Sequence, residues 1–330
     1  MKSSRPILLL LVLIPGLLLS GEYADAFLLA SFHPQVQSMG NSSVALGVVS
    51  GHAMNNPAGF GSLGKPNISM VYQDYGGLSS NVGGEVFYPV SERYKLGITF
   101  VHSGVSDLIT RPNLLGLTPD VRRDSVRTLQ GRTGDPIDYR EDAVILSLAR
   151  EFEFTINLGW KFFKIPCRLP VGASIKYIDK LLVDNRGLGT GFDVGAQLFF
   201  NMGGMTDLLS NTEFSIGLVS TDILNSPVYW NTEHQDAIKR NFSFGFGMSQ
   251  NIERYESEIT FSTSSHSRYE SLRQYGVQLN VKDRIHLRGG HDGVTPSFGL
   301  GIALKKFIIG YTFSHHELAE MQKIGLNYRF

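Results

Sequence analysis

The chain has 330 residues, and its 30 basic residues balance its 30 acidic ones, so the charge gives no indication of non-specific nucleic-acid binding. Charged residues make up 18% of the chain, below the roughly 25% of soluble domains, while its 36 glycines exceed the usual share of about 7%. This composition is typical of strands joined by turns. The single cysteine, Cys167, excludes an intramolecular disulfide, and its proline-containing flanks indicate a connector rather than a catalytic site.

The first 26 residues have the pattern of a secretory signal peptide. Two basic residues precede an apolar run over 7–19, and a small-x-small cleavage site ends at Ala26. The run is short for a membrane-spanning helix, which needs about 20 apolar residues, so an uncleaved anchor is the weaker alternative. We therefore expect export, cleavage of residues 1–26 and a mature chain that starts near Phe27.

Residues 27–66 precede the first expected strand and are rich in small residues. They include the motif Asn56-Pro57-Ala58-Gly59, in which Asn-Pro favours a turn and the small residues allow close packing. A compact segment of this kind suits a narrow space, so we predict a plug inside a barrel. A flexible periplasmic arm is the alternative, since Gly, Ser and Asn also suit disorder.

From residue 67 onward, apolar and polar residues alternate in segments of about ten residues, as in membrane barrel strands. A soluble sandwich could alternate similarly but does not usually need so many long strands in succession. Because lipid admits only helices and closed barrels, we predict an all-β, antiparallel transmembrane barrel of about 14 strands over 67–330. The expected segments are 68–75, 82–90, 94–103, 141–150, 168–180, 190–200, 212–220, 240–250, 255–264, 271–281, 284–292, 296–304, 307–315 and 321–330.

The connections between these segments indicate which end of the barrel faces the periplasm. Barrels of this class have short periplasmic turns and longer outer loops, so the odd-numbered connections should be the long ones. The odd connections 104–140 and 221–239 are long. The even connections 151–167 and 201–211 are longer than expected, and 153–163 is a candidate extra strand. The long connection 104–140 carries mixed charge, which suits solvated surface or, as the sharper alternative, a binding lid.

The last segment, 321–330, has one apolar and one polar face. Ile324 and Leu326 share a face with Tyr328 and Phe330, while Lys323 lies on the other. A terminal Phe with an aromatic residue two positions before it is typical of the closing strand of a bacterial outer-membrane barrel. We therefore expect Tyr328 and Phe330 to be contacted by the barrel-assembly machinery, and the protein to lie in the outer membrane of a Gram-negative-type cell.

No motif points to an enzyme, a cofactor or a metal. His291-Asp292-Gly293 is typical of a turn, and His315-His316-Glu317 of a polar loop, because neither has a third ligand at zinc-like spacing. The glycine-rich stretch 187–191 lacks the Lys-Ser/Thr ending of a phosphate-binding loop. We assign no catalytic, cofactor-binding or metal residues.

Five short motifs stand out along the chain: Met39-Gly-Asn-Ser-Ser-Val-Ala45, Asn56-Pro-Ala-Gly59, Leu287-Arg-Gly-Gly-His-Asp-Gly293, Ser297-Phe-Gly-Leu-Gly301 and Ile324-Gly-Leu-Asn-Tyr-Arg-Phe330. These motifs resemble the PorV/PorQ family, within the wider FadL-like group of outer-membrane proteins. The resemblance implies a fourteen-stranded barrel with an N-terminal plug, in agreement with the count from alternation.

The resemblance implies two functions. PorV- and PorQ-like members act in type IX secretion or surface attachment, with secreted cargo proteins and a sortase-like partner, and this is our leading expectation. FadL-like members pass a hydrophobic small molecule through a plugged lumen, which requires apolar residues on the lumen face or on the plug, such as Phe27, Leu28, Leu29 and Phe32. A structural or adhesive surface barrel is the third alternative. The inferred lumen face is mostly polar, with Gln274, Gln278, Asn280, Arg288 and Lys323.

Overall fold

The computed structural model describes residues 26–29, 33–47, 50–105, 108–110, 116–129, 137–159, 164–202, 211–268, 273–316 and 319–330. The expected signal peptide lies outside these ranges, apart from its last residue. The charged connection 104–140 is described in part, and it includes the exposed helix α4 (Pro119–Leu129).

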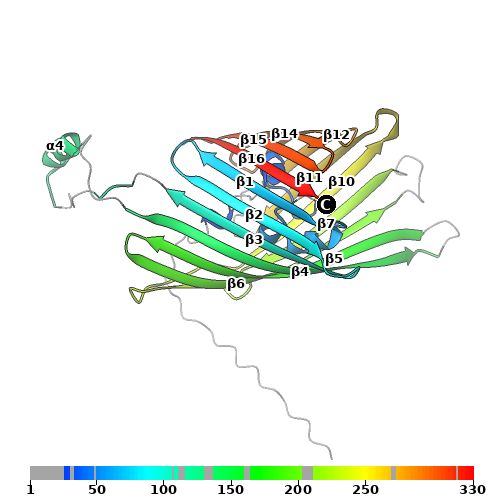
Figure 1. Cartoon of the computed structure of the whole chain (residues 1–330), viewed down its shortest axis with the longest axis horizontal. Coiled ribbons are helices and arrows are strands. Elements are labelled where there is room, and N and C mark those ends of the chain that lie inside the picture. The colour runs from blue at the N-terminus through cyan, green and yellow to red at the C-terminus, as the bar shows by residue number, and fades with distance from the viewer. Residues whose placement is uncertain are drawn as a thin grey trace, which may run out of the picture.

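The described residues form a closed antiparallel barrel of fourteen strands (Figure 1), which confirms the predicted fold class and strand count. Closure is made by the first and last strands, which pair along their length from Asn67 opposite Arg329 to Tyr75 opposite Met321. The barrel strands are β1 (Asn67–Tyr75), β2 (Ser80–Pro89), β3 (Tyr94–Val105), β4 (Tyr139–Asn157), β5 (Lys164–Leu182), β6 (Asn185–Asn201), β7 (Thr212–Thr221), β10 (Asn241–Ile252), β11 (Ser257–His266), β12 (Arg273–Val281), β13 (Ile285–His291), β14 (Pro296–Leu304), β15 (Phe307–His315) and β16 (Glu320–Arg329).

The remaining two strands, β8 (Pro227–Trp230) and β9 (Gln235–Ala237), form a hairpin inside the long connection between β7 and β10. β8 pairs with the first part of β6, where Gly187 lies opposite Trp230 and Gly189 opposite Val228. The connection at 221–239 is therefore folded against the barrel.

The alternation along each strand separates an apolar outer face from a small or polar inner face. On β10, Phe242 and Phe244 are 49% and 44% exposed, whereas Ser243 is 2% exposed. Large apolar side chains are exposed in the same way around the whole wall, which is the arrangement of a barrel whose outer face meets lipid. Among the described residues, no helix has both the length and the apolar character needed to cross a membrane.

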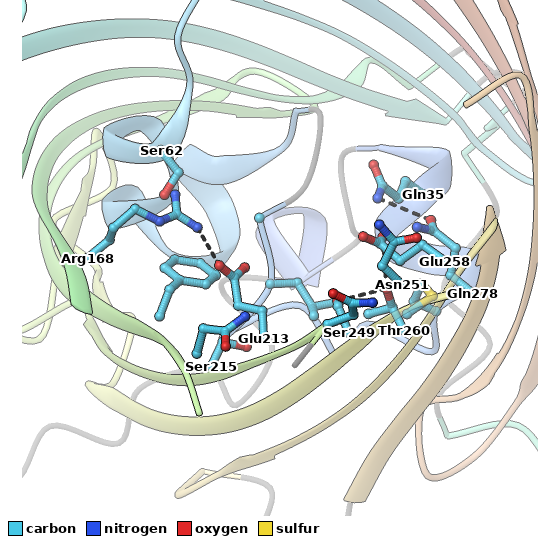
Figure 2. Close-up of a pocket in the computed structure, with 16 residues that line it drawn as sticks. Gln35, Ser62, Arg168, Glu213, Ser215, Ser249, Asn251, Glu258, Thr260 and Gln278 are labelled. Carbon is cyan, nitrogen blue, oxygen red and sulfur yellow. Dashed lines mark hydrogen bonds and ion pairs between the residues drawn. The ribbon is translucent and has the colours of Figure 1, made fainter. Parts of the chain in front are cut away.

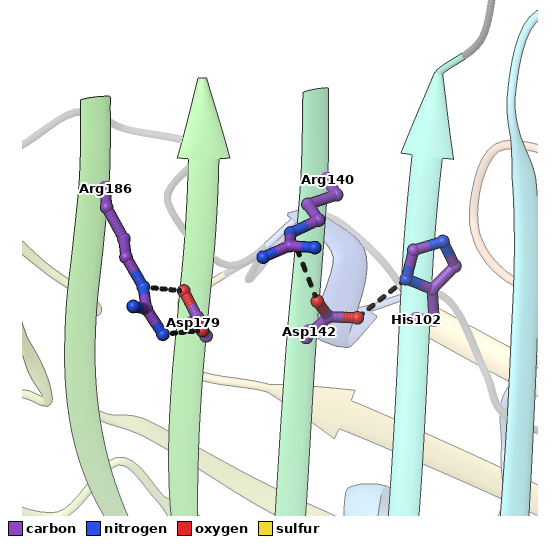
Figure 3. A network of polar contacts seen from close by, with 5 residues as sticks. All are labelled: His102, Arg140, Asp142, Asp179 and Arg186. Atoms are coloured by element: carbon purple, nitrogen blue, oxygen red, sulfur yellow. Dashed lines mark hydrogen bonds and ion pairs between the residues drawn. The ribbon is translucent and has the colours of Figure 1, made fainter. Parts of the chain in front are cut away.

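We call the band of exposed apolar side chains on the outer face the outer belt. On β3, β4, β5 and β6, charged side chains lie at the edge of this belt, at the end of the barrel with the long connections (Figure 3). There the His102 ring lies 2.6 Å from the Asp142 carboxylate, and Arg140 lies 3.7 Å from the same carboxylate. On the next two strands, Arg186 donates two hydrogen bonds to Asp179, at 2.9 and 2.5 Å. We call this end the long-connection end, and the opposite end the short-turn end.

At the short-turn end, the structure corrects the expectation of an extra strand over 153–163. β4 and β5 are each nineteen residues long and pair from Tyr139 opposite Leu182 to Asn157 opposite Lys164. The apolar positions of the supposed strand continue the outward phase of β4, so the strand simply runs on. For the same reason Cys167 lies within β5 and is buried, not in a connector. The other long even connection, 201–211, falls mostly outside the described residues.

The N-terminal segment, residues 27–66, lies inside the barrel (Figure 1, blue). It contains three short α-helices, α1 (Ala26–Leu29), α2 (Pro34–Ser38) and α3 (His52–Asn55), and the 3-10 helix η1 (Pro57–Ser62). α2 packs on β13 to β16, and η1 packs on β3 to β6. Most of its described residues are buried, and its role as a plug stays a prediction. We call residues 27–66 the plug segment.

Candidate functional site in the plugged lumen

Glycines on the inner wall allow the backbone of the plug segment to touch the strands. A Cβ atom on Gly172 would lie closer than 3.0 Å to Pro57, and one on Gly217 closer than 3.0 Å to Val44. The same holds for inward glycines on β12, β13 and β14, which face the stretch from Ser38 to Gly40. The high glycine content therefore has a local cause: a side chain at these positions would occupy the space of the plug segment.

The motif Asn56-Pro57-Ala58-Gly59 lies at the inner wall of β5, β6 and β7. The Asn56 amide donates to the carbonyl oxygens of Val44 at 2.9 Å, Ala196 at 3.3 Å and Leu218 at 3.4 Å. Its side-chain oxygen accepts from the backbone N–H of Ala58 at 3.1 Å, which caps η1. A single side chain thus joins two parts of the plug segment to two barrel strands.

Gln197 on β6 strengthens the contact with the same wall. Its side-chain amide donates to the carbonyl oxygens of Val44 at 3.0 Å and Leu46 at 3.1 Å. Gln197 is 1% exposed, so these hydrogen bonds form away from bulk water. Pro57 and Gly59 contribute differently: Pro57 begins η1, and a Cβ on Gly59 would collide with the His52 ring.

A buried carboxylate on β2 holds the start of α3, and the sequence did not indicate this contact. Glu85 is fully buried and accepts hydrogen bonds from the Gly51 N–H at 3.0 Å and the Thr99 hydroxyl at 3.1 Å. An anion at the N-terminal end of a helix satisfies N–H groups that have no partner within the helix. The alternation does place Glu85 inside the barrel, which was the available signal, but it cannot identify the segment that meets it.

The opposite wall contacts α2 through hydrogen-bonding side chains of β12 and β15. The Gln37 amide donates to Ser314 at 3.0 Å, and the Thr312 hydroxyl donates to the Pro34 carbonyl at 2.7 Å. Gln35 reaches Gln278 at 3.4 Å, and Gln278 in turn accepts from Arg288 at 2.7 Å. Gln278 and Arg288, which the sequence placed on the lumen face, therefore contribute to the position of the plug segment.

Near the long-connection end, the lumen contains an apolar cluster, which we call the apolar chamber. It is made of Phe27, Val71, Val101, Ala143, Ile178, Val228 and Ile238, with Leu28, Met54 and Trp230 packed against it. Phe27 of the plug segment is 4% exposed, and the Lys180 ammonium lies 5.1 Å from its ring centroid. Phe32, which the sequence also suggested as an apolar contributor, lies outside the described residues.

The connection between β7 and β10 covers this chamber and is anchored by a buried ion cluster. Lys176 lies 2.9 Å from the Asp193 carboxylate and 2.8 Å from that of Asp222, the first residue after β7. Asp222 also accepts from the Ser226 hydroxyl at 2.6 Å. This pairing offsets the cost of three buried charges and fixes the connection that carries Val228 into the chamber.

Near the short-turn end, a polar cavity of about 560 Å³ lies between the plug segment and the strands β5, β6, β7, β10, β11 and β12 (Figure 2). Arg168 and Glu213 face each other across part of it, with 2.8 Å between guanidinium and carboxylate. The cavity is lined by Gln35, Met39, Leu46, Gly47, Ser62, Arg168, Phe199, Asn201, Asn211, Glu213, Ser215, Ser249, Asn251, Glu258, Thr260 and Gln278. The two ends of the lumen thus differ in chemistry.

The first histidine motif, His291-Asp292-Gly293, forms a turn. The Asp292 carboxylate accepts from the N–H groups of Val294 at 2.9 Å and Thr295 at 2.7 Å, as expected of a turn residue. His315 and His316 are described, whereas the neighbouring Glu317 is not. Within the described part of the chain, no three His, Cys, Asp or Glu residues come together as a metal site.

The sequence matches no protein-family model and no curated protein. Solved barrels are similar in fold. The toluene transporter TodX of Pseudomonas putida has a TM-score of 0.48 and 10% identity, covering 88% of this chain and 95% of its own. The CymD monoaromatic hydrocarbon channel has a TM-score of 0.38 and 10% identity, covering 91% and 98%. Omp33 of Acinetobacter baumannii has a TM-score of 0.39 and 9% identity, covering 81% and 98%.

The chain is an outer-membrane β-barrel. This follows from its closed even-stranded sheet, its apolar outer face and its polar, filled interior. The similarities above concern the fold alone, and they do not show the more specific PorV/PorQ resemblance. Tyr328 pairs with Ile68 of β1, Phe330 lies one residue past the last pair, and the centroids of their two rings are 4.9 Å apart. Their recognition by the assembly machinery stays a prediction.

Proposed function

We propose that the protein conducts hydrophobic small molecules across the outer membrane through its plugged lumen. The observation that carries this proposal is the apolar chamber, a cluster of apolar side chains from the inner wall, the plug segment and the connection between β7 and β10. Apolar pockets with few polar groups are the usual binding sites for such molecules. TodX and CymD are described as a toluene transporter and a monoaromatic hydrocarbon channel, and their chemistry is of the same class.

In this proposal, Phe27 occupies the place of the transported molecule. It belongs to the plug segment and fills the chamber with an aromatic side chain, so a ligand has to displace it. The plug segment is held against the wall by hydrogen bonds and glycine contacts, with no disulfide in the described chain, which allows displacement. The polar cavity lies on the far side of the plug segment and provides the exit.

Trp230, which packs against the chamber, provides the test. The chain has two tryptophans, so the Trp160→Phe variant leaves Trp230 as the sole indole fluorophore. This variant in phospholipid vesicles is titrated with 9,10-dibromostearate, a quencher, and with stearate as the unbrominated reference. We expect saturable quenching of Trp230, and a lower apparent Kd after Phe27→Ala vacates the chamber.

Matched substitutions on the two faces of β5 make the test specific. Ile178 faces the chamber and is fully buried, whereas Ile175 is 44% exposed on the outer face. We expect Ile178→Asn to raise the apparent Kd roughly tenfold or more, because a polar group replaces an apolar contact, and Ile175→Asn to leave it unchanged. Quenching that rises without saturation, or that responds equally to both variants, contradicts the proposal.

Secretion or surface attachment of the PorV/PorQ type is the second proposed function. This function requires recognition of a protein. The observation that favours it is the last part of β4, residues 151–157, which extends beyond β3 and has one edge unpaired in the described chain. In the bacterium that makes this protein, deletion of the gene should then prevent release or attachment of surface proteins while uptake of the hydrophobic probe is unaffected. The reverse result supports transport instead.

A further inference from the structure

The hairpin of β4 and β5 extends past its neighbour at the short-turn end and leaves one edge of β4 unpaired. β3 begins at Tyr94, which lies opposite Arg150. From Glu151 to Asn157, β4 continues as a strand whose pairing in the described chain is with β5 alone. At about 3.3 Å per residue, these seven residues expose about 23 Å of strand edge.

The exposed edge lies beyond the ring of aromatic residues that bounds the outer belt at this end. These aromatic residues include Tyr88, Tyr94 and Phe307. The guanidinium carbon of Arg150 lies 5.4 Å from the centroid of the Tyr94 phenol ring. Aromatic and arginine side chains of this kind lie at the membrane interface. The strand that follows Arg150 therefore enters the aqueous compartment at the short-turn end.

The side chains of this edge are nevertheless apolar on one face. Phe152, Phe154 and Ile156 are 39%, 43% and 40% exposed and point to the outer side of the hairpin. Glu151 and Glu153 alternate with them on the other side. Natural proteins often protect an exposed strand edge with a bulge, a proline or charged side chains; residues 151–157 have neither a bulge nor a proline, and their charged residues are Glu151 and Glu153.

A second copy of the chain does not fit this edge. Two copies in one membrane point the same way along the membrane normal, so their β4 edges also run the same way. A twofold contact between two such edges requires antiparallel strands. The occupant must therefore come from a molecule whose orientation the membrane does not fix.

We propose that residues 151–157 of β4 bind a strand of a soluble periplasmic protein by strand addition. Main-chain hydrogen bonds to the free edge supply the affinity, and alternate side chains supply the specificity. The added strand carries apolar residues opposite Phe152, Phe154 and Ile156 and basic residues opposite Glu151 and Glu153, because cross-strand pairs of like polarity or opposite charge are favourable. This inference is independent of small-molecule transport through the lumen.

The test uses hydrogen exchange of the β4 amides in protein reconstituted into phospholipid nanodiscs. The probe is a nine-residue peptide of alternating valine and lysine. We expect it to slow exchange at least tenfold for those amides of 151–157 that point away from β5, with no change over 139–150, where β4 pairs on both sides. A peptide N-methylated at every amide should give no protection, and one of alternating valine and glutamate should bind at least tenfold more weakly.

Substitutions separate strand addition from simple hydrophobic contact. Phe154→Lys with Ile156→Lys places two charges on the apolar face and should abolish protection by the valine-lysine peptide. Ile165→Lys on β5, which pairs with Ile156 but lies away from the free edge, is the matched control and should retain it. Slow exchange, before peptide is added, of those amides of 151–157 that point away from β5 shows that lipid or protein already covers the edge. That result, or equal protection by the N-methylated peptide, overturns the proposal.

Discussion

The outer and inner faces of the barrel wall share the same alternating strands but respond to different partners. On β10, the outward Phe244 is 44% exposed to the surroundings of the barrel, whereas the inward Gly245 meets the side chain of Val44 and the backbone of Ala45. The outer face needs only to be apolar, because lipid adapts to its shape. The inner face must match a particular segment of chain, so it depends on individual residues such as Glu85 and Gln197.

The largest difference between the faces is expected for a charge introduced into the outer belt. Phe244→Arg should destabilise the barrel by roughly 2–4 kcal/mol in a bilayer, because an arginine near mid-bilayer is costly on the lipid face. The measurement is the free energy of unfolding in phospholipid vesicles, taken from the dependence of folding on denaturant concentration. Ser249→Arg on the same strand faces the polar cavity and should cost much less. Equal tolerance at both positions contradicts the assignment of the faces.

On the inner face, removal of the Glu85 carboxylate should destabilise the plug segment by about 1–3 kcal/mol, because buried N–H groups at the start of α3 lose their acceptor. The measurement is hydrogen exchange of the amides from Gly51 to Asn55, which should become faster in Glu85→Ala. Glu85→Gln keeps an acceptor oxygen and should lie close to the wild type. Unchanged exchange in Glu85→Ala means that the plug segment does not depend on this wall.

A smaller effect is expected at the plug motif. Asn56→Ala removes the cap of η1 and the hydrogen bonds to Val44 and the wall, which should cost about 0.5–2 kcal/mol for the cap. Single-channel recording in planar bilayers should show more frequent openings than in the wild type. Asn55→Ala removes only a hydrogen bond to Gly51 within the plug segment and is the matched control. Equal opening frequencies in the two variants contradict a wall-anchoring role for Asn56.

The sequence predicted the outer face much better than the inner one. Each of the fourteen expected segments falls on one barrel strand. The alternation of apolar and polar residues can be recognised within a segment without knowing which strand pairs with it. The extension of β4 was a candidate separate strand because Phe154 and Ile156 repeat the alternation of apolar and polar residues. Alternation alone does not show whether two such segments belong to one strand. The hairpin of β8 and β9 was missed because strands of four and three residues are too short to show a period. Contacts such as Glu85 with Gly51 join positions far apart in the chain, and alternation carries no information about them.

The smallest expected effect is a pH dependence of the plug segment through His33, which caps α2 by accepting from the Gln35 N–H at 3.2 Å. Burial, with further contributions from Arg288, Lys323 and His52, holds the pKa of His33 well below its ordinary value of 6.5. The pKa of His33 is thus lower in the folded than in the unfolded chain. The contribution of neutral His33 to the stability of the folded state is therefore complete above pH 6.5 and is lost as the pH falls below it. Channel openings should therefore become more frequent at pH 5 than at pH 7.5. His33→Asn retains a capping acceptor but does not titrate, so its openings should not change between these two values. If channel openings in His33→Asn also become more frequent at pH 5, the pH response comes from another group. His33 is then not one of the inner-face contacts that control the plug segment.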